Sequence, residues 1–302
     1  MKNVVVTGAN GFIGSALVHE LLNHGIRVNA LVRGRFNNLP RHKNLKIYQV
    51  SLDKFDTFDC EIKDIDVFYH LAWEGSSGEG RSNPMLQITN IKWTMDSLYL
   101  AERMGAKRFV GAGSLMEKEV LHDVPVMENK PSDVSVYGTA KLSSHYMTKA
   151  VSAKIGIEHL WCYLTAYGIG DNPHRFVCAT IKKMLEGKKV LQFTKADQYY
   201  DFVYITDTAR ALYLLGAKGK PFCAYNIGSG SPNKLNYYIT EMKKVLNADC
   251  ELDFGAYEYK GIYLPKEEFE CADLQNDTGF RCNIAYEDGI IQTSQWLRSS
   301  IL

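Results

Sequence analysis

A tyrosine and a lysine stand four residues apart in the run Tyr137-Gly138-Thr139-Ala140-Lys141. On a helix this spacing places both side chains on one face, where they can act together. A free phenol titrates near ~10 and exchanges protons poorly at neutral pH, but a nearby ammonium group favours the phenolate and lowers its pKa. The pair predicts a proton shuttle, with an exposed tyrosine and a surface lysine as the alternative interpretation.

A third candidate, Ser114, follows an apolar segment that ends in Gly111-Ala112-Gly113. If that segment is a strand, Ser114 lies at its carboxyl end, which is where open α/β sheets bind ligands. There its hydroxyl can hydrogen-bond a substrate oxygen. An ordinary turn serine is the alternative.

Glycines punctuate the first residues of the chain, where Val-Val-Val-Thr at residues 4–7 leads into Gly8, Gly11 and Gly14. A helical pattern follows over residues 15–23. Gly8 permits a tight turn, Gly11 lets the backbone approach a pyrophosphate, and Gly14 lets helix and strand pack closely. The free N–H groups at the helix start favour an anion. The sequence therefore predicts a dinucleotide site.

Strand and helix patterns alternate through the first half of the chain. Further strands are expected at residues 27–32, 45–50, 67–72, 108–111 and 159–164, and a long helix at 137–155. The predicted fold class is α/β, a Rossmann-type doubly wound parallel sheet with a smaller C-terminal substrate-binding domain. We expect residues 1–170 with 199–230 to form the dinucleotide-binding domain, and 171–198 with 231–302 the substrate-binding cap.

Composition narrows the possible partners. The 302 residues carry a formal net charge of +1 with interspersed signs, so no basic stripe predicts nucleic acid as a partner. The seven cysteines form no C-x-x-C pair, which favours reduced thiols and no metal site. Because no apolar run approaches ~20 residues and no signal peptide is evident, we expect no membrane association and place the protein in the cytoplasm.

Taken together, these motifs resemble the extended short-chain dehydrogenase/reductase family, the branch with nucleotide-sugar epimerases, dehydratases and 4-ketoreductases. The resemblance covers nearly the whole chain. The matching pieces are the glycine run, His70-Leu71-Ala72, Asn90, residues 109–114, the Tyr137/Lys141 pair, Tyr167-Gly168-Ile169-Gly170, residues 201–207 and Tyr225-Asn226-Ile227-Gly228.

The resemblance implies a role for each matching residue. Tyr137 would be the general acid/base, Lys141 would lower its pKa and hold the nicotinamide ribose, and Ser114 would bind the reacting oxygen. The residues expected to bind the cofactor are Gly8, Asn10, Gly11, Phe12, Ile13, Gly14, Arg33, Ser51, Leu52, Leu71, Ala72, Trp73, Asn90, Tyr137 and Lys141.

Two departures from the family pattern concern the cofactor. NAD-preferring relatives usually carry an acid after the second strand, whereas this chain has Arg33, followed by Gly34 and Arg35. Since arginine can bind a 2′-phosphate bidentately, Arg33, with Arg35 as a possible helper, favours NADP, with NAD possible and a solvated loop arginine as the alternative. Ser51 stands where the family has an adenine-binding aspartate, which leaves the adenine contact open.

The substrate side departs further. Tyr199-Tyr200 replaces an arginine that commonly binds the nucleotide pyrophosphate, and Thr165 replaces a familiar substrate-binding asparagine. Arg81 and Arg175 are candidate replacement cations, although each could equally be a solvated charge.

We therefore expect an NAD(P)(H)-dependent oxidoreductase of the 4-ketoreductase type that reduces a keto group on a nucleotide-linked sugar. Three alternatives stay open: an epimerase that retains NAD(P), a reductase of a small non-phosphorylated ketone or aldehyde, and a non-catalytic dinucleotide sensor. Relatives often pair through two long helices, which predicts a homodimer through about residues 86–103 and 137–155.

Overall fold

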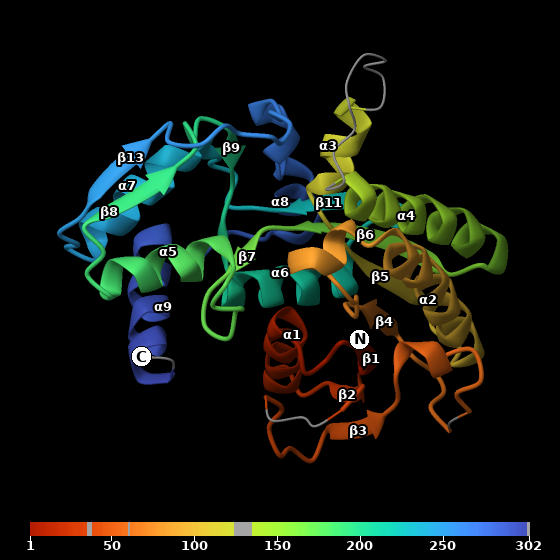
Figure 1. Cartoon of the computed structure of the whole chain (residues 1–302). Helices are drawn as coiled ribbons and strands as arrows, with labels where there is room; N and C mark the ends of the chain where they lie inside the picture. Colours follow the sequence, from red (N-terminus) through yellow and green to blue (C-terminus); the bar gives the residue numbers. More distant parts are fainter. Residues whose placement is uncertain (35–37, 60, 124–134, 301–302) are drawn as a thin grey trace.

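A parallel sheet of seven strands forms the centre of the computed structural model, which describes residues 1–34, 38–59, 61–123 and 135–300 (Figure 1). Every strand pair in it is parallel. In spatial order the strands are β11 (Ala224–Ile227), β6 (Glu158–Leu164), β5 (Arg108–Gly113), β4 (Val67–His70), β1 (Asn3–Thr7), β2 (Arg27–Val32) and β3 (Leu45–Gln49). The direction of winding reverses beside β1, so the ligand site of such a sheet is expected at its carboxyl end.

Helices cover both faces of this sheet. Along β1, Val4 and Val6 pack on one face and Val5 on the other, as the two-residue period of a strand requires. The first face is covered by α1 (Phe12–Asn23) and α6 (Ile205–Lys218), and the second by α2 (Pro84–Arg103) and α4 (Ser135–Ile155). The predicted α/β doubly wound class is confirmed.

A smaller C-terminal lobe lies beside the sheet (Figure 1). It contains α5 (Phe176–Leu185), β8 (Val190–Phe193), α7 (Leu235–Val245), β13 (Glu251–Phe254) and α9 (Tyr286–Ser300), packed around a core of its own. Of the segment expected to return to the main sheet, only β11 does so, since β10 (Val203–Tyr204) pairs with β7 (Ala166–Tyr167) outside it. The proposed domain boundaries remain a prediction.

The remaining elements are short. They are η1 (Leu52–Lys54), η2 (Gly78–Ser82), α3 (Met116–Asp123), β9 (Tyr199–Tyr200), β12 (Asn233–Lys234), η3 (Lys266–Phe269) and α8 (Ala272–Thr278). Within the described ranges, no helix combines the length and apolar character needed to cross a membrane.

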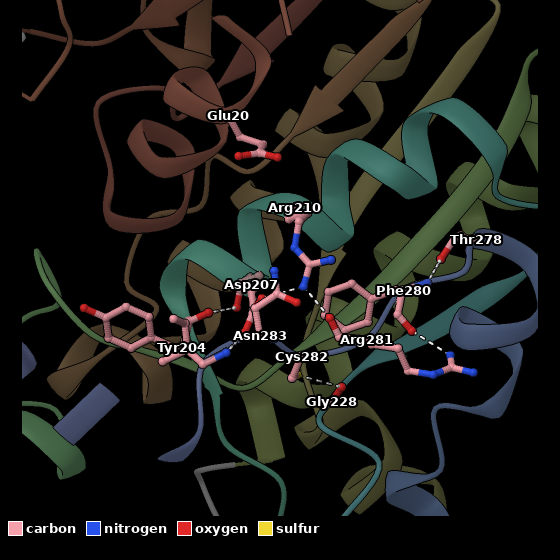
Figure 2. A network of polar contacts seen from close by, with 12 residues as sticks. Glu20, Tyr204, Asp207, Arg210, Gly228, Thr278, Phe280, Arg281, Cys282 and Asn283 are labelled. Atoms are coloured by element: carbon pink, nitrogen blue, oxygen red, sulfur yellow. Dashed lines mark hydrogen bonds and ion pairs between the residues drawn. The ribbon is translucent and has the colours of Figure 1, made fainter. Parts of the chain in front are cut away.

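Asp207, on α6, ties the C-terminal part of the chain to the main domain (Figure 2). One oxygen of its buried carboxyl group pairs with Arg210 at 2.6 Å, and the other accepts backbone N–H bonds from Asn283 and Ile284, both at 2.9 Å. Arg210 also donates to the carbonyl of Arg281. These bonds satisfy a buried acidic group and fix the segment that leads into α9 against α6.

Candidate active site

The glycine run forms the predicted tight turn between β1 and α1. Gly8 has φ of +65°, and a Cβ there would lie 2.8 Å from the backbone nitrogen of Ala72. A Cβ on Gly14 would meet the carbonyl oxygen of Gly8 at 2.1 Å. The helix begins at Phe12 after Gly11, which provides no side-chain cap, so the N–H groups of the first turn are free to bind an anion.

A cavity of about 780 Å³ lies against this turn, within the size range of small-molecule and cofactor sites. It is lined by twelve of the residues predicted to bind the cofactor: Gly8, Asn10, Gly11, Phe12, Ile13, Gly14, Arg33, Ser51, Leu52, Leu71, Ala72 and Trp73. A glycine cradle beside an uncapped helix N-terminus suits a dinucleotide pyrophosphate. We call this space the dinucleotide cavity.

Asn90 does not line either of the two cavities of this site. It is buried on α2, where its Oδ1 accepts from the backbone N–H of Glu74 at 3.0 Å and its Nδ2 donates to the carbonyl of Glu74 at 2.8 Å. The structure thus gives Asn90 a bracing contact to the loop after β4. Its predicted contact with the cofactor stays a prediction.

Arg33 lies at the edge of the dinucleotide cavity and is already paired. Its Nη1 lies 3.0 Å from Oε2 of Glu74, which the sequence analysis did not single out and which lines the same cavity. Arg35 falls outside the described residues. An anion that binds Arg33 would therefore lie next to the carboxylate of Glu74.

A second cavity, of about 1080 Å³, adjoins the first, and we call it the substrate cavity. Both are lined by Ile13, Leu71, Trp73, Ser76, Ser77, Asp171 and Arg175, so they are continuous. The substrate cavity is also lined by the remaining predicted catalytic and substrate-binding residues: Ser114, Tyr137, Lys141, Thr165 and Arg81. The fold therefore brings the predicted chemical groups together next to the predicted cofactor site.

Tyr137 lies buried in the wall of the substrate cavity. Burial and, to a smaller extent, the charge of Glu117 raise the pKa of its phenol, whereas the charge of Arg81, a hydrogen bond with Ser114 and the charge of Arg175 lower it. The Arg81 guanidinium carbon lies 4.7 Å from the centre of the Tyr137 ring. The hydrogen bond to Ser114 joins the two groups expected to share a substrate oxygen.

Lys141 is buried beside Tyr137, and burial lowers its pKa to about 7. Its Nζ donates to the carbonyl oxygen of Ala112 at 2.6 Å and lies 3.7 Å from the centre of the Trp73 ring. Arg81 and Arg175 are cations whose charges lower the pKa of Tyr137 in this structure, and the predicted effect of Lys141 on that pKa stays a prediction. Lys141 lines the substrate cavity and lies against Trp73, which lines both cavities.

Glu117, which the sequence analysis did not identify, holds the backbone of Ser114 in place. Its fully buried carboxyl group accepts the backbone N–H of Ser114 at 2.8 Å and the indole N–H of Trp161 at 3.0 Å. Nδ1 of the buried His145 lies 3.3 Å away. No sequence signal would reveal this group, because Trp161 and His145 come from β6 and α4.

Three acidic residues line the substrate cavity: Glu119, Asp171 and Glu258. Burial raises the pKa of Glu119 to about 7 against the opposing charge of Arg81, and raises that of Asp171 to about 6 against that of Arg175. Arg175 lies 3.5 Å from Asp171, and the Thr165 hydroxyl donates to the carbonyl of Asp201. The predicted substrate cations therefore lie among carboxyl groups.

A dinucleotide cavity at the switch point of a parallel sheet, continuous with a cavity that holds a serine, a tyrosine and a lysine, defines the site of a nicotinamide-dependent enzyme. The chain belongs to the NAD dependent epimerase/dehydratase family, whose sequence model matches residues 4–228. It is an enzyme of the extended short-chain dehydrogenase/reductase type.

Individual relatives agree with this assignment over the whole chain. A UDP-glucuronate 4-epimerase of Thermodesulfobacterium geofontis is 25% identical over 322 residues, which cover 100% of this chain and 98% of that protein. The solved UDP-N-acetylglucosamine 4-epimerase of Methanobrevibacter ruminantium, in complex with UDP-N-acetylmuramic acid, has a TM-score of 0.81 at 23% identity and covers 99% of both chains. MoeE5, in complex with UDP-glucuronic acid and NAD, has a TM-score of 0.78 at 24% identity and covers 99% of this chain and 100% of its own.

Proposed function

We propose that this enzyme oxidises and reduces a carbon of the sugar in a nucleotide sugar, using a nicotinamide dinucleotide. The observation that carries the proposal is that Ser114, Tyr137 and Lys141 line a cavity continuous with the dinucleotide cavity. The cofactor supplies hydride transfer when bound. Ser114 holds the reacting oxygen, Tyr137 moves its proton, and Lys141 contacts the nicotinamide ribose from its place beside Trp73.

Between the two reactions that share these residues, we favour epimerisation with retained cofactor over net reduction by NADPH. The sequence argument for a 4-ketoreductase depended on Arg33 being available to a 2′-phosphate, and Arg33 is paired with Glu74. The relatives support the same choice, because two of those named above are 4-epimerases and another was solved with NAD. The ketoreductase is the second candidate, supported by the guanidinium group of Arg33 at the cavity edge.

The fate of the hydride separates the two candidates. An epimerase should be purified with bound nicotinamide, convert a UDP-sugar without added cofactor and leave the absorbance of reduced nicotinamide unchanged. Sugar products resolved by chromatography are the readout. A ketoreductase would consume one NADPH for each keto-sugar nucleotide reduced, with a continuous fall in absorbance. Turnover of neither kind across a panel of UDP- and dTDP-sugars would contradict the proposed function.

Arg81 and Arg175 support a phosphate-bearing substrate, because both line the substrate cavity where the family's usual arginine is replaced by Tyr199-Tyr200. If they bind the nucleotide, Arg175→Ala should raise KM for a nucleotide sugar and leave that for a phosphate-free ketone unchanged. Equal effects on both would favour the reductase of small carbonyl compounds.

We also propose a homodimer in the cytoplasm. The paired helices α2 and α4 expose four large apolar side chains, Ile88, Tyr99, Tyr146 and Met147, which a partner subunit could cover. The cysteines of the described residues are free thiols, as expected in a reducing compartment. Sedimentation should give twice the 34.1 kDa chain mass, and Tyr146→Glu should shift it towards the monomer.

A further inference from the structure

The loop after β4 is held rigidly against α2. The backbone of Glu74 makes two hydrogen bonds with the buried Asn90, at 3.0 and 2.8 Å. Gln87, also buried on α2, accepts from the Trp73 indole at 3.0 Å and donates to the carbonyls of Gly75 and Gly80 at 3.1 and 2.7 Å. Because both polar groups of its backbone are hydrogen-bonded, Glu74 has a fixed backbone position from which its side chain extends.

That carboxylate points at the end of β2. Glu74 and Arg33 both line the dinucleotide cavity, and their side chains meet at 3.0 Å. Arg33 follows Gly14 by 19 positions, the place from which sheets of this kind contact the adenosine ribose. An acid at this place accepts hydrogen bonds from the ribose hydroxyls of NAD, whereas an arginine binds the 2′-phosphate of NADP.

We propose that Glu74 is a specificity-determining residue that makes this site prefer NAD over NADP, although the strand end itself carries an arginine. The inference rests on the proposed function, which requires a nicotinamide dinucleotide in this cavity. Glu74 acts in two ways: its carboxylate competes with a 2′-phosphate for the Arg33 guanidinium, and it repels the negative charge of that phosphate. The 2′-hydroxyl of NAD carries no charge and can donate a hydrogen bond to the same carboxylate.

The expected effect is moderate, since both side chains are partly exposed, 73% for Arg33 and 43% for Glu74. An ion pair in water is worth little, and the repulsion between a carboxylate and a phosphate a few ångströms apart is screened. Removing the Glu74 charge should therefore improve NADPH binding about three- to tenfold relative to NADH.

The test is direct binding, which needs no knowledge of the sugar substrate. Dissociation constants for NADH and NADPH are measured by fluorescence titration on the full-length protein freed of bound nucleotide, for wild type, Glu74→Gln and the control Glu79→Gln. Glu79 belongs to the same loop region but lines neither cavity. We expect wild type to bind NADH more tightly, and Glu74→Gln to lower the ratio Kd(NADPH)/Kd(NADH) about three- to tenfold while Glu79→Gln leaves it within twofold.

A double variant checks that Glu74 acts through Arg33. In an Arg33→Gln background, Glu74→Gln should improve NADPH binding less than it does in wild type, because no guanidinium remains to be released. An unchanged ratio in Glu74→Gln, an equal change in Glu79→Gln, or a wild-type preference for NADPH would each overturn the inference and leave the proposed function standing. Failure of both dinucleotides to bind to wild type would refute the proposed function itself, and the inference with it.

Discussion

Replacing Glu117 by alanine should destabilise the protein strongly without touching the surface of either cavity. Its carboxyl group accepts two buried N–H donors, from Ser114 at 2.8 Å and from the Trp161 indole at 3.0 Å. Alanine leaves both donors without an acceptor, and a buried unsatisfied donor costs about 1–3 kcal/mol. The loss of the adjacent His145 contact adds to this. We expect the free energy of unfolding to fall by about 4 kcal/mol.

Urea denaturation followed by tryptophan fluorescence measures this loss. With a slope of about 3 kcal/mol per molar, the midpoint should fall by about 1 M. The matched control is Glu158→Ala, which removes a carboxyl group that pairs with Arg108 at 2.5 Å. Because Glu158 is 43% exposed and Arg108 keeps its bonds to the carbonyls of Leu215 and Gly216, this change should cost less than about 1 kcal/mol.

Equal losses in the two variants would refute the reasoning. It would mean that the buried donors find water when the carboxyl group is removed. A second check is Glu117→Gln. An amide oxygen in the place of Oε1 lies 2.8 Å from the Ser114 nitrogen and 3.1 Å from the Trp161 indole nitrogen, so this variant can keep both bonds and should be more stable than Glu117→Ala.

The remaining predictions concern the titratable groups of the substrate cavity. Tyr137→Phe should lower turnover at least ~10²-fold with the Kd for dinucleotide nearly unchanged, as measured by steady-state kinetics and titration. Lys141→Met should weaken dinucleotide binding about tenfold through loss of a charged hydrogen bond, yet leave the unliganded protein no less stable at pH 7. Burial lowers the pKa of Lys141 in the folded protein to about 7. Between pH 7 and the higher pKa of a lysine in the unfolded chain, the unfolded chain therefore binds more protons than the folded protein. The stability of wild type relative to Lys141→Met should accordingly increase as pH rises from 7 to 9. Burial raises the pKa of Glu119 to about 7, so wild type loses stability as pH rises from about 4.5 to 7, and Glu119→Gln should stabilise more at pH 8 than at pH 5 in urea titrations. A pH-independent gain would contradict that assignment.

Sequence patterns predicted the parts of this fold that are determined by single residues or by short segments. The glycine turn was predictable because Gly8 needs a left-handed backbone and Gly14 has no room for a side chain, which are constraints on single positions. The strand over residues 27–32 matches its predicted bounds, since buried parallel strands are continuous apolar runs between polar turns. The Tyr137/Lys141 pair was predictable because four residues is one helical turn.

Contacts between distant segments were not predictable in the same way. Arg33 and Glu74 meet only because β2 and β4 both flank β1, so the loops that follow them open on one cavity. Sequence alone presented Arg33 as an unpaired cation and therefore favoured NADP. Similarly, Asn90 was expected at the cofactor, whereas its two contacts with the Glu74 backbone depend on how α2 lies against the loop after β4.

The same contrast explains the electrostatics of the substrate cavity. From spacing, Lys141 was expected to lower the pKa of Tyr137, and the structure adds that both side chains are buried, which penalises the charged form of each. Tyr137 has a raised pKa and Lys141 a lowered one. Both groups can exchange protons at the pH of catalysis only if other charges offset the effect of burial. Arg81 opposes the shift at Tyr137, and Glu117 opposes the shift at Lys141. Arg81, on η2, and Glu117, which binds the backbone of Ser114, thus offset burial at Tyr137 and Lys141 respectively, although the charge of Glu117 also raises the pKa of Tyr137. Neither residue belongs to the motif that reveals the site.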